Sequence, residues 1–581
     1  MTEEGNRLNV RAFLFLLTTL CVGLVMRLWG DSFGLPHIFH SDEAFEVHRA
    51  LRLAKGGFDI ERWAKGGLYM LLCVEYGVYF LVQRVQGAVN SVDAFAMEFA
   101  KDPTVFWKIG RVTVAFLGTW TIWKVWRHGR RLAGVGAGLY AAWFLAFSFR
   151  HVVESHTVTV DVPMALFTFW AVAMIVEEAC GVRRLRGWAF ALVAGIALLH
   201  KVPAIVLFVP YFVNSMIRGG VARGGRDEER GLFTKATWLP FFGACGLYVG
   251  LNPGVVLGFS EALGFFGGTN SGAPGDPGDA SEMVRGVSLW GFYFRSLLHS
   301  QGPVGLSLAL MGVVFGLRRR AGAMLLHLSF LLPFFVLITA TSSPHLYYDR
   351  YIVPMLPGLC LLAGLGLDGL LRALRLDRAV MAPVGMLVAL MLVLGPAAES
   401  VRFNQKMTRT DTRTLAAEWM EANVANGTTV LLEGFPEDPS QQSIPLRPDE
   451  DGILEMVMRL ELTDAGKAEL WRLRMHAWET RICYDLLAVR DFELWDTLEK
   501  YRLLGAEYAV IRREAFTPGN WRRGRFREEI VAKRLAFREE MVADPECRLV
   551  AAFDPADDDS PGYHIEIWRL GASASTGSEA D

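Results

Sequence analysis

The sequence lacks an excess of either charge, because its 581 residues carry 59 lysines and arginines against 61 aspartates and glutamates, a formal net charge of −2. Nucleic-acid-binding proteins usually present a strongly basic surface, so this balance argues against that class. Charged residues make up only 21%, whereas 52% are hydrophobic, and the mean hydropathy is +0.27. The composition is too apolar for an ordinary soluble domain and too polar for a bundle of membrane helices alone.

Cysteine is scarce, with seven in the chain. Five of them lie in or beside apolar segments, where a thiol packs as a small hydrophobic side chain. Cys483 and Cys547 lie in the polar C-terminal part, and an oxidising compartment would allow a disulfide between them. The sequence also lacks a short apolar run with a cleavage site, so we expect the first apolar segment to be a retained span rather than a removed signal peptide.

Long apolar runs with few charges dominate the first 396 residues. Runs of close to twenty such residues are long enough to cross a bilayer. They occur at 12–29, 105–125, 132–149, 162–179, 188–216 (a tight pair), 238–251, 304–317, 321–341, 351–367 and 380–394. The sequence therefore predicts an α-helical, polytopic membrane protein with about eleven spans.

Arginine clusters between these runs predict the orientation in the membrane. Short loops rich in arginine mark the cytoplasmic side, and five such clusters occur near residues 127–131, 183–186, 218–226, 318–320 and 372–378. All five are cytoplasmic only if the N-terminus is cytoplasmic and the apolar segment 67–89 does not cross. Glu75, Arg84 and three tyrosines make that segment amphipathic, which favours a helix lying in the outer interface. We therefore expect a multi-pass protein of a bacterial inner or plasma membrane.

The remaining residues, 397–581, are predicted to form a soluble, extracytoplasmic α/β domain. Helix-like and strand-like patterns alternate in this part. They are 411–426 with 428–432, 492–504 with 507–511, and 532–542 with 548–553, followed by a closing strand at 564–568. The predicted domains are thus a membrane domain over 1–396 and this external domain.

Two acidic positions stand out on the predicted outer side. Asp42, in the first external loop, could cap a helix or act as a general base toward a hydroxyl or amine. Asp161, at the start of an apolar segment, could also cap a helix, but an ionisable group at the edge of a membrane helix is often functional. Metal ligation is an alternative for the polar residues nearby, although their spacing is not diagnostic. These residues are His37, His40, Glu43 and His48 in the first external loop, and His151, Glu154 and His156 before Asp161.

Three cations are predicted to face the same side, namely Lys65, Lys201 and Arg350. Each one alone could simply extend its charge to the membrane surface. Together with the two acids, they favour a site for an anionic, phosphate-bearing substrate.

The order of these motifs resembles the GT-C superfamily of integral-membrane glycosyltransferases, in particular aminoarabinose transferases and protein O-mannosyltransferases. The resemblance covers roughly residues 10–396. The matching elements are Asp42-Glu43 followed by an amphipathic helix, KGGLY at 65–69, Arg111, Asp161, HKVP at 200–203 and RYIVPMLP at 350–357. The chain departs from the family pattern at Gly66 and Gly67, where the family has prolines, and at His200, which replaces a small residue.

This resemblance implies transfer of a sugar from a polyprenyl-phosphate carrier to a glycan, lipid or protein acceptor at the outer face, with inversion. The implied catalytic residues are Asp42, Glu43 and Asp161, with Asp42 as the base. The implied donor-phosphate ligands are Lys65, Arg111, Lys201 and Arg350. No resident metal site is implied, although a divalent cation could take part. The alternatives are a lipid or glycan transporter or flippase, and a non-catalytic membrane scaffold with an external binding domain.

Overall fold

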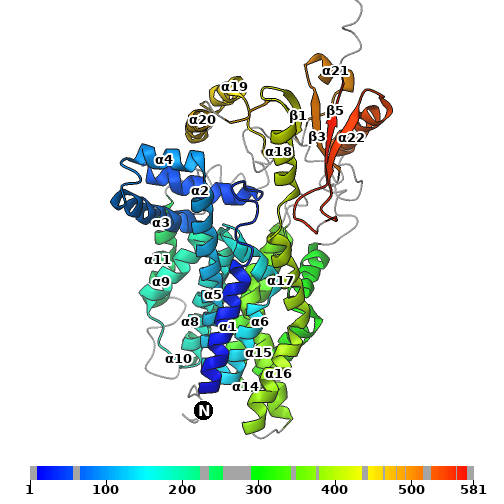
Figure 1. Cartoon of the computed structure of the whole chain (residues 1–581). Helices are drawn as coiled ribbons and strands as arrows, with labels where there is room; N and C mark the ends of the chain where they lie inside the picture. The colour runs from blue at the N-terminus through cyan, green and yellow to red at the C-terminus, as the bar shows by residue number, and fades with distance from the viewer. Residues whose placement is uncertain are drawn as a thin grey trace, which may run out of the picture.

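The computed structural model describes residues 10–55, 66–222, 234–252, 289–341, 348–374, 378–434, 442–461, 465–478, 481–490, 493–513, 525–557 and 559–571. Apolar helices form a long bundle below a smaller α/β part (Figure 1). The bundle helices are α1 (Val10–Leu28), α5 (Thr104–Ala133), α6 (Val135–Ala146), α7 (Phe149–Val153), α8 (Asp161–Ala179), α9 (Gly187–His200), α10 (Phe208–Ala222), α11 (Lys235–Leu251), α14 (Leu289–Thr341), α15 (Leu356–Ala373), α16 (Arg378–Leu392) and α17 (Leu394–Met407). Three short 3-10 helices connect them, η2 (Glu154–His156), η3 (Val202–Leu207) and η6 (Asp349–Met355).

Every apolar run predicted to span the membrane coincides with one or more of these helices. Helix α14 covers two predicted spans, 304–317 and 321–341. Its backbone leaves the helical conformation at Gly302 and at Arg320, and the second of these breaks separates the two spans. By length and composition, five described helical segments could cross a membrane, or six if one bent pair counts as a span. The predicted helical membrane fold is therefore confirmed, whereas the count of eleven spans stays a prediction.

The described residues of the first loop after α1 form three helices, α2 (Ser41–Ala54), α3 (Gly66–Val85) and α4 (Val92–Lys101). Figure 1 shows them lying crosswise to α1 and α5, at the end of the bundle away from the N-terminus. Helix α3 covers the segment predicted to be interfacial. It is also long and apolar enough to cross a membrane, so its crosswise course, rather than its composition, supports an interfacial position.

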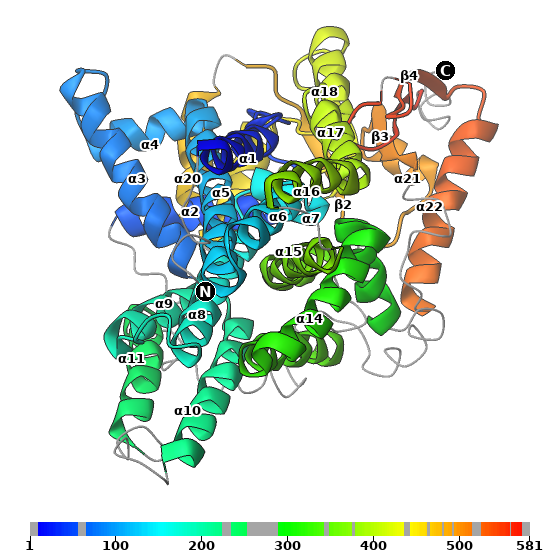
Figure 2. The same ribbon diagram turned by 90° about the horizontal axis from the view of Figure 1, so that it is seen from below.

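Close helix packing in the bundle depends on small residues. Gly312 of α14 and Gly366 of α15 face each other's helix so closely that a Cβ at Gly312 would overlap the carbonyl of Leu362, and one at Gly366 the carbonyl of Leu308. Small residues at such positions let membrane helices approach with their backbones in contact. Seen from below, α14 and α15 accordingly lie side by side (Figure 2).

In the described residues, arginines of the predicted clusters lie at the end of the bundle opposite α2. Arg131 pairs with Glu177, and Arg218 Nη1 lies 2.7 Å from Glu178 Oε1. At the same end, Arg372 donates to the carbonyl of Ala133 at 3.1 Å. These contacts join the C-terminal ends of α5, α8, α10 and α15. The charge asymmetry used to predict orientation is therefore also a spatial asymmetry of the bundle.

The C-terminal part is a layered α/β domain around one mixed sheet in the order β2-β1-β3-β5-β4. Strand β1 is parallel to β2 and β3, whereas β5 is antiparallel to β3 and β4. Its elements are α18 (Thr412–Asn423), β1 (Thr429–Glu433), α19 (Glu450–Glu461), α20 (Ala465–Ala477), β2 (Asp485–Val489), α21 (Leu498–Leu503), β3 (Tyr508–Arg512), α22 (Arg525–Ala543), β4 (Arg548–Phe553) and β5 (Ile565–Arg569). The alternation predicted from the sequence is confirmed, but it omitted β2 and the α19–α20 pair.

Cys483 and Cys547 are both free thiols, so the structure contradicts the disulfide considered for them. Helix α17 runs through the predicted domain boundary at residue 396, and the sheet domain begins with α18.

A buried charge cluster lies at the C-terminal ends of the neighbouring strands β1 and β3. Glu433, at the end of β1, is fully buried and pairs with Arg512 of β3 at 3.0 Å and with the fully buried Arg534 of α22. Burial alone would raise the pKa of Glu433, but the two guanidinium groups outweigh it and hold that pKa below its ordinary value. The cluster thus joins two strands and one covering helix.

We expect Glu433→Gln to lower the free energy of unfolding of the C-terminal domain by about 3–5 kcal/mol, because it leaves a buried arginine without its counter-charge. Urea titration of the full chain, read by pulse proteolysis of this domain, measures the loss. Glu507→Gln, at an exposed glutamate just before β3, is the matched control. A loss no larger than that of the control would contradict this role.

Candidate functional site

Four charged side chains form a continuous chain at the end of the bundle that carries α2. Arg350 Nη1 lies 2.6 Å from Asp42 Oδ2, and Arg350 Nε lies 3.8 Å from Asp161 Oδ2. The other carboxylate oxygen of Asp161 accepts a hydrogen bond of 2.8 Å from Lys201 Nζ. Acids and cations therefore alternate in the order Asp42, Arg350, Asp161, Lys201.

Helix ends and breaks put these side chains in place. Asp161 is the first residue of α8, where the helix dipole favours a negative charge. Lys201 has an extended backbone between α9 and η3, and Pro203 lies in the first turn of η3, where its missing N–H costs no helical hydrogen bond. Arg350 is the second residue of η6. Each side chain thus leaves the backbone where a regular helix is interrupted.

Asp42 and Asp161 differ in depth. The Asp161 side chain is only 4% exposed, whereas that of Asp42 is 37% exposed. The cations also contact aromatic rings, since Lys201 Nζ lies 4.5 Å from the ring centre of Tyr351 and the Arg350 guanidinium lies 4.5 Å from that of Tyr348. Asp161 is therefore the buried centre of the chain of charges, and Asp42 lies at its open end.

Helix capping does not account for Asp42. The N-cap residue of α2 is His40, and its side chain makes no capping hydrogen bond. Asp42 lies one residue inside the helix and pairs with Arg350 instead. The N-cap residue of α8 is likewise not Asp161 but Val160.

Glu43 and Arg111 form a separate, buried ion pair. Arg111 donates from Nε and Nη2 to the two carboxylate oxygens of Glu43 at 2.9 and 2.8 Å, and both side chains are fully buried. Arg111 also donates to the carbonyls of Asp31 and Phe33 at 2.7 and 2.8 Å, while Glu43 accepts from the amide of Val158 at 2.9 Å. The pair thereby fixes the start of α2, α5 and two loops, a bracing geometry that differs from the catalytic and phosphate-binding roles predicted from the sequence.

A second polar network lies beside the first and was not anticipated from the sequence. Arg150 pairs with Asp349 and, at 3.3 Å, with Glu154, and Ser296 donates to Asp349 at 2.9 Å. Its signals in the sequence are that Asp349 directly precedes Arg350 and that Glu154 lies in the polar segment before Asp161. Burial raises the pKa of Glu154; Arg150 opposes this rise, and the negative charge of Asp161 adds to it.

Lys65 lies outside the described residues, so its predicted role stays a prediction. The metal-site alternatives find no support, because no three His, Cys, Asp or Glu side chains gather as a metal site in the described ranges. His48 packs against Phe99 and Trp107, and His151 Nδ1 contacts Arg27 at 3.0 Å. These histidines therefore contribute to packing and to structural hydrogen bonds.

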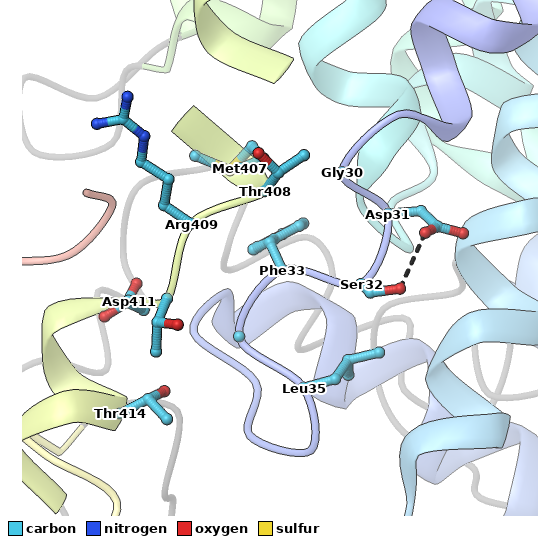
Figure 3. Close-up of a pocket in the computed structure, with 12 residues that line it drawn as sticks. Gly30, Asp31, Ser32, Phe33, Leu35, Met407, Thr408, Arg409, Asp411 and Thr414 are labelled. Carbon is cyan, nitrogen blue, oxygen red and sulfur yellow. Dashed lines mark hydrogen bonds between the residues drawn. The ribbon is translucent and has the colours of Figure 1, made fainter. Parts of the chain in front are cut away.

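A cleft of about 340 Å³ separates the end of α1 from the start of the C-terminal domain. One wall is the loop Gly30–Leu35, and the other runs from Met407 to Asp411 and includes Thr414. Figure 3 shows Phe33 between Met407 and Ser32. The carbonyls of Asp31 and Phe33 hold the first wall to Arg111, so the cleft and the start of α2 are joined by one side chain.

Comparisons with known proteins give one family match and several similar structures. The model of the family described as dolichyl-phosphate-mannose-protein mannosyltransferase matches residues 106–225. This segment contains Arg111, Asp161 and Lys201. The predicted resemblance to membrane glycosyltransferases is thus confirmed. A search of curated proteins gives no match.

Several solved structures are similar over most of the chain. ArnT from Cupriavidus metallidurans bound to undecaprenyl phosphate has a TM-score of 0.49 and 13% identity, covering 97% of this chain and 98% of that one. The Archaeoglobus fulgidus oligosaccharyltransferase AglB with an inhibitory peptide and a dolichol-phosphate gives 0.47 and 11%, covering 87% and 70%. The same enzyme with Zn and sulfate gives 0.47 and 12%, covering 87% and 68%. All of these TM-scores are below 0.5, so the likeness carries no functional argument.

We expect Glu154→Gln to raise the melting temperature relative to wild type, with a difference that grows as the pH rises. The raised pKa of Glu154 means that the fold favours its neutral form. The neutral form's contribution to the stability of the fold is complete below the ordinary glutamate pKa of about 4.3, and it is lost as the pH rises through the pKa of Glu154 in the folded protein. Tryptophan fluorescence during thermal unfolding, between pH 4 and pH 8, measures this.

Glu98→Gln, at an exposed position of α4, serves as the control and should show no such trend. A Glu154→Gln difference that shrinks as the pH rises would show that the ion pair with Arg150 outweighs burial.

Proposed function

We propose that the protein is a membrane glycosyltransferase that moves a sugar from a polyprenyl-phosphate carrier to an acceptor. The observation that carries this proposal is the chain Asp42–Arg350–Asp161–Lys201, in which the buried Asp161 contacts two cations and one of them, Arg350, also contacts the partly exposed Asp42. The match to a mannosyltransferase family over the segment that includes Asp161 and Lys201 supports it.

Arg350 and Lys201 are the proposed ligands of the carrier phosphate. A guanidinium binds phosphate oxygens through two parallel hydrogen bonds, and an ammonium adds a compact charge. When the bond from the sugar to the phosphate breaks, negative charge grows on the phosphate oxygen, and fixed cations stabilise that charge. Asp161, which contacts both cations, is proposed to position them.

Asp42 is the proposed general base. The acceptor oxygen attacks the anomeric carbon while Asp42 takes its proton. The bond from this carbon to the phosphate oxygen breaks, and its electron pair leaves with the carrier phosphate. A single displacement of this kind inverts the anomeric centre. The partial exposure of Asp42 fits this role, because an acceptor must reach the base from outside the bundle.

Glu43 and Arg111 are proposed to brace this site rather than to bind the donor. Their ion pair is fully buried and its donors are already shared between Glu43 and two backbone carbonyls. Because Glu43 directly follows Asp42, the pair fixes the backbone that carries the base.

The proposed location is a bacterial plasma membrane, with the N-terminus in the cytoplasm and the C-terminal domain outside. The arginine clusters, which collect at the end of the bundle near α1's first residue, support this orientation. Residues 1–396 would form the catalytic membrane domain and 397–581 the external domain. The cleft between Gly30–Leu35 and Met407–Thr414 is the proposed approach for the acceptor. Arg111 links one wall of this cleft to the start of α2, which carries the proposed base Asp42.

Asp42→Asn should lower the rate of sugar transfer by at least about 100-fold, since positioned proton transfer contributes about 10²- to 10⁴-fold to a reaction rate. Mass spectrometry of membranes from cells that carry wild-type or variant protein should show one polyprenyl-linked sugar accumulating and one surface glycan modification lost. Asp93→Asn, an exposed aspartate in the first turn of α4, is the matched control.

No change with a correctly inserted Asp42→Asn protein would reject the transferase proposal and favour a scaffold. Loss of the surface modification with the lipid-linked sugar trapped on the cytoplasmic face would instead favour a flippase.

A further inference from the structure

The contact between Arg350 and Asp42 raises a problem for the proposed mechanism. In the donor-free protein, the guanidinium lies 2.6 Å from the carboxylate that must accept a proton. His40 Nε2 lies 3.5 Å from the same Nη1 atom, so this nitrogen is already surrounded. The carboxylate oxygen and the guanidinium nitrogen thus occupy each other, so neither an acceptor hydroxyl nor a carrier phosphate has free access to them.

We propose that Arg350 couples donor binding to base release: the carrier phosphate takes the guanidinium from Asp42, and the freed carboxylate then serves as the base. This inference rests on the proposed function. It makes binding ordered, because the acceptor meets a competent base only after the donor is bound.

Burial decides which of the two contacts of Arg350 is exchanged. The Asp161 side chain is 4% exposed, whereas Asp42 is 37% exposed. An incoming phosphate therefore reaches the guanidinium from the side of Asp42. Asp161 stays in place and also holds Lys201 at 2.8 Å, so both cations keep their position while one partner changes.

The charge balance favours this exchange. Two carboxylates and two cations make the chain of contacts neutral before the donor binds. A phosphate adds negative charge and takes up Arg350, which leaves Asp42 as a carboxylate without its former counter-charge. Its oxygen is then open to the hydroxyl of an acceptor. The base thus becomes active in the complex that needs it.

The coupling predicts that loss of the base tightens donor-side binding. In Asp42→Asn, the phosphate no longer competes with a carboxylate for Arg350, so the Kd for farnesyl phosphate should fall about tenfold, within the usual range of coupling between sites. Arg350→Gln should raise this Kd by about tenfold or more. In the Arg350→Gln background, adding Asp42→Asn should not lower the Kd for farnesyl phosphate, because the cation for which the phosphate and Asp42 compete is absent.

The measurement is titration of the purified full chain in nanodiscs with farnesyl phosphate, at fixed ionic strength. Asp349→Asn is the matched control, because Asp349 is also 37% exposed and also pairs with one arginine, but with Arg150. Its Kd should equal that of wild type. An equal gain in this control would reveal a general effect of removing negative charge and would overturn the inference.

The outcomes separate the two proposals. If wild type binds farnesyl phosphate and Arg350→Gln weakens binding, but Asp42→Asn leaves the Kd unchanged or raises it, the coupling is wrong while the proposed donor site stands. If wild type shows no binding, the donor assignment and therefore the proposed function fail together.

Discussion

The buried pair of Glu43 and Arg111 is the interaction on which the arrangement of the site depends. A bidentate contact between a guanidinium and a carboxylate fixes both distance and orientation. Through the backbone groups of Asp31, Phe33 and Val158, it joins the loop after α1, the start of α2, α5 and the loop before α8. Removing either partner would leave a charge buried without compensation, which is strongly destabilising. In the proposed exchange, the partly exposed Asp42 gives up Arg350, while Glu43 beside it keeps its buried contact with Arg111 and holds the backbone in place.

The bundle uses charge differently at its two ends. Where the arginine clusters lie, acids such as Glu177 and Glu178 pair with arginines and join helix ends. At the other end, Asp161 holds two cations, one of which, Arg350, also contacts the partly exposed Asp42. About 25 Å of helix rise along α8 separates Asp161 from Glu177. Similar ion pairs thus join helix ends at one end of the bundle and form the proposed donor site at the other.

Much of this could be predicted from the sequence. Apolar runs identify the helices because the bilayer sets their length, and charges at helix edges identify Asp161, Lys201 and Arg350 as neighbours of one surface. The partner of Arg111 could not be predicted, because Glu43 lies 68 residues away and looks like a second catalytic acid beside Asp42. Strand β2 was missed because it begins with Asp485, a residue that is rare in strands. The role of Arg150 depends on packing that no periodicity reveals.

Helix α9 has a consequence for where the chemistry takes place. Its 14 residues rise only about 21 Å, whereas the apolar core of a bilayer is about 30 Å thick. If α9 starts at one membrane surface, Lys201 at its end lies well below the other. Lipid phosphates are found near that depth when a protein thins the membrane around itself. The carrier would then stay in its leaflet during the reaction, and the acceptor would be the partner that has to descend.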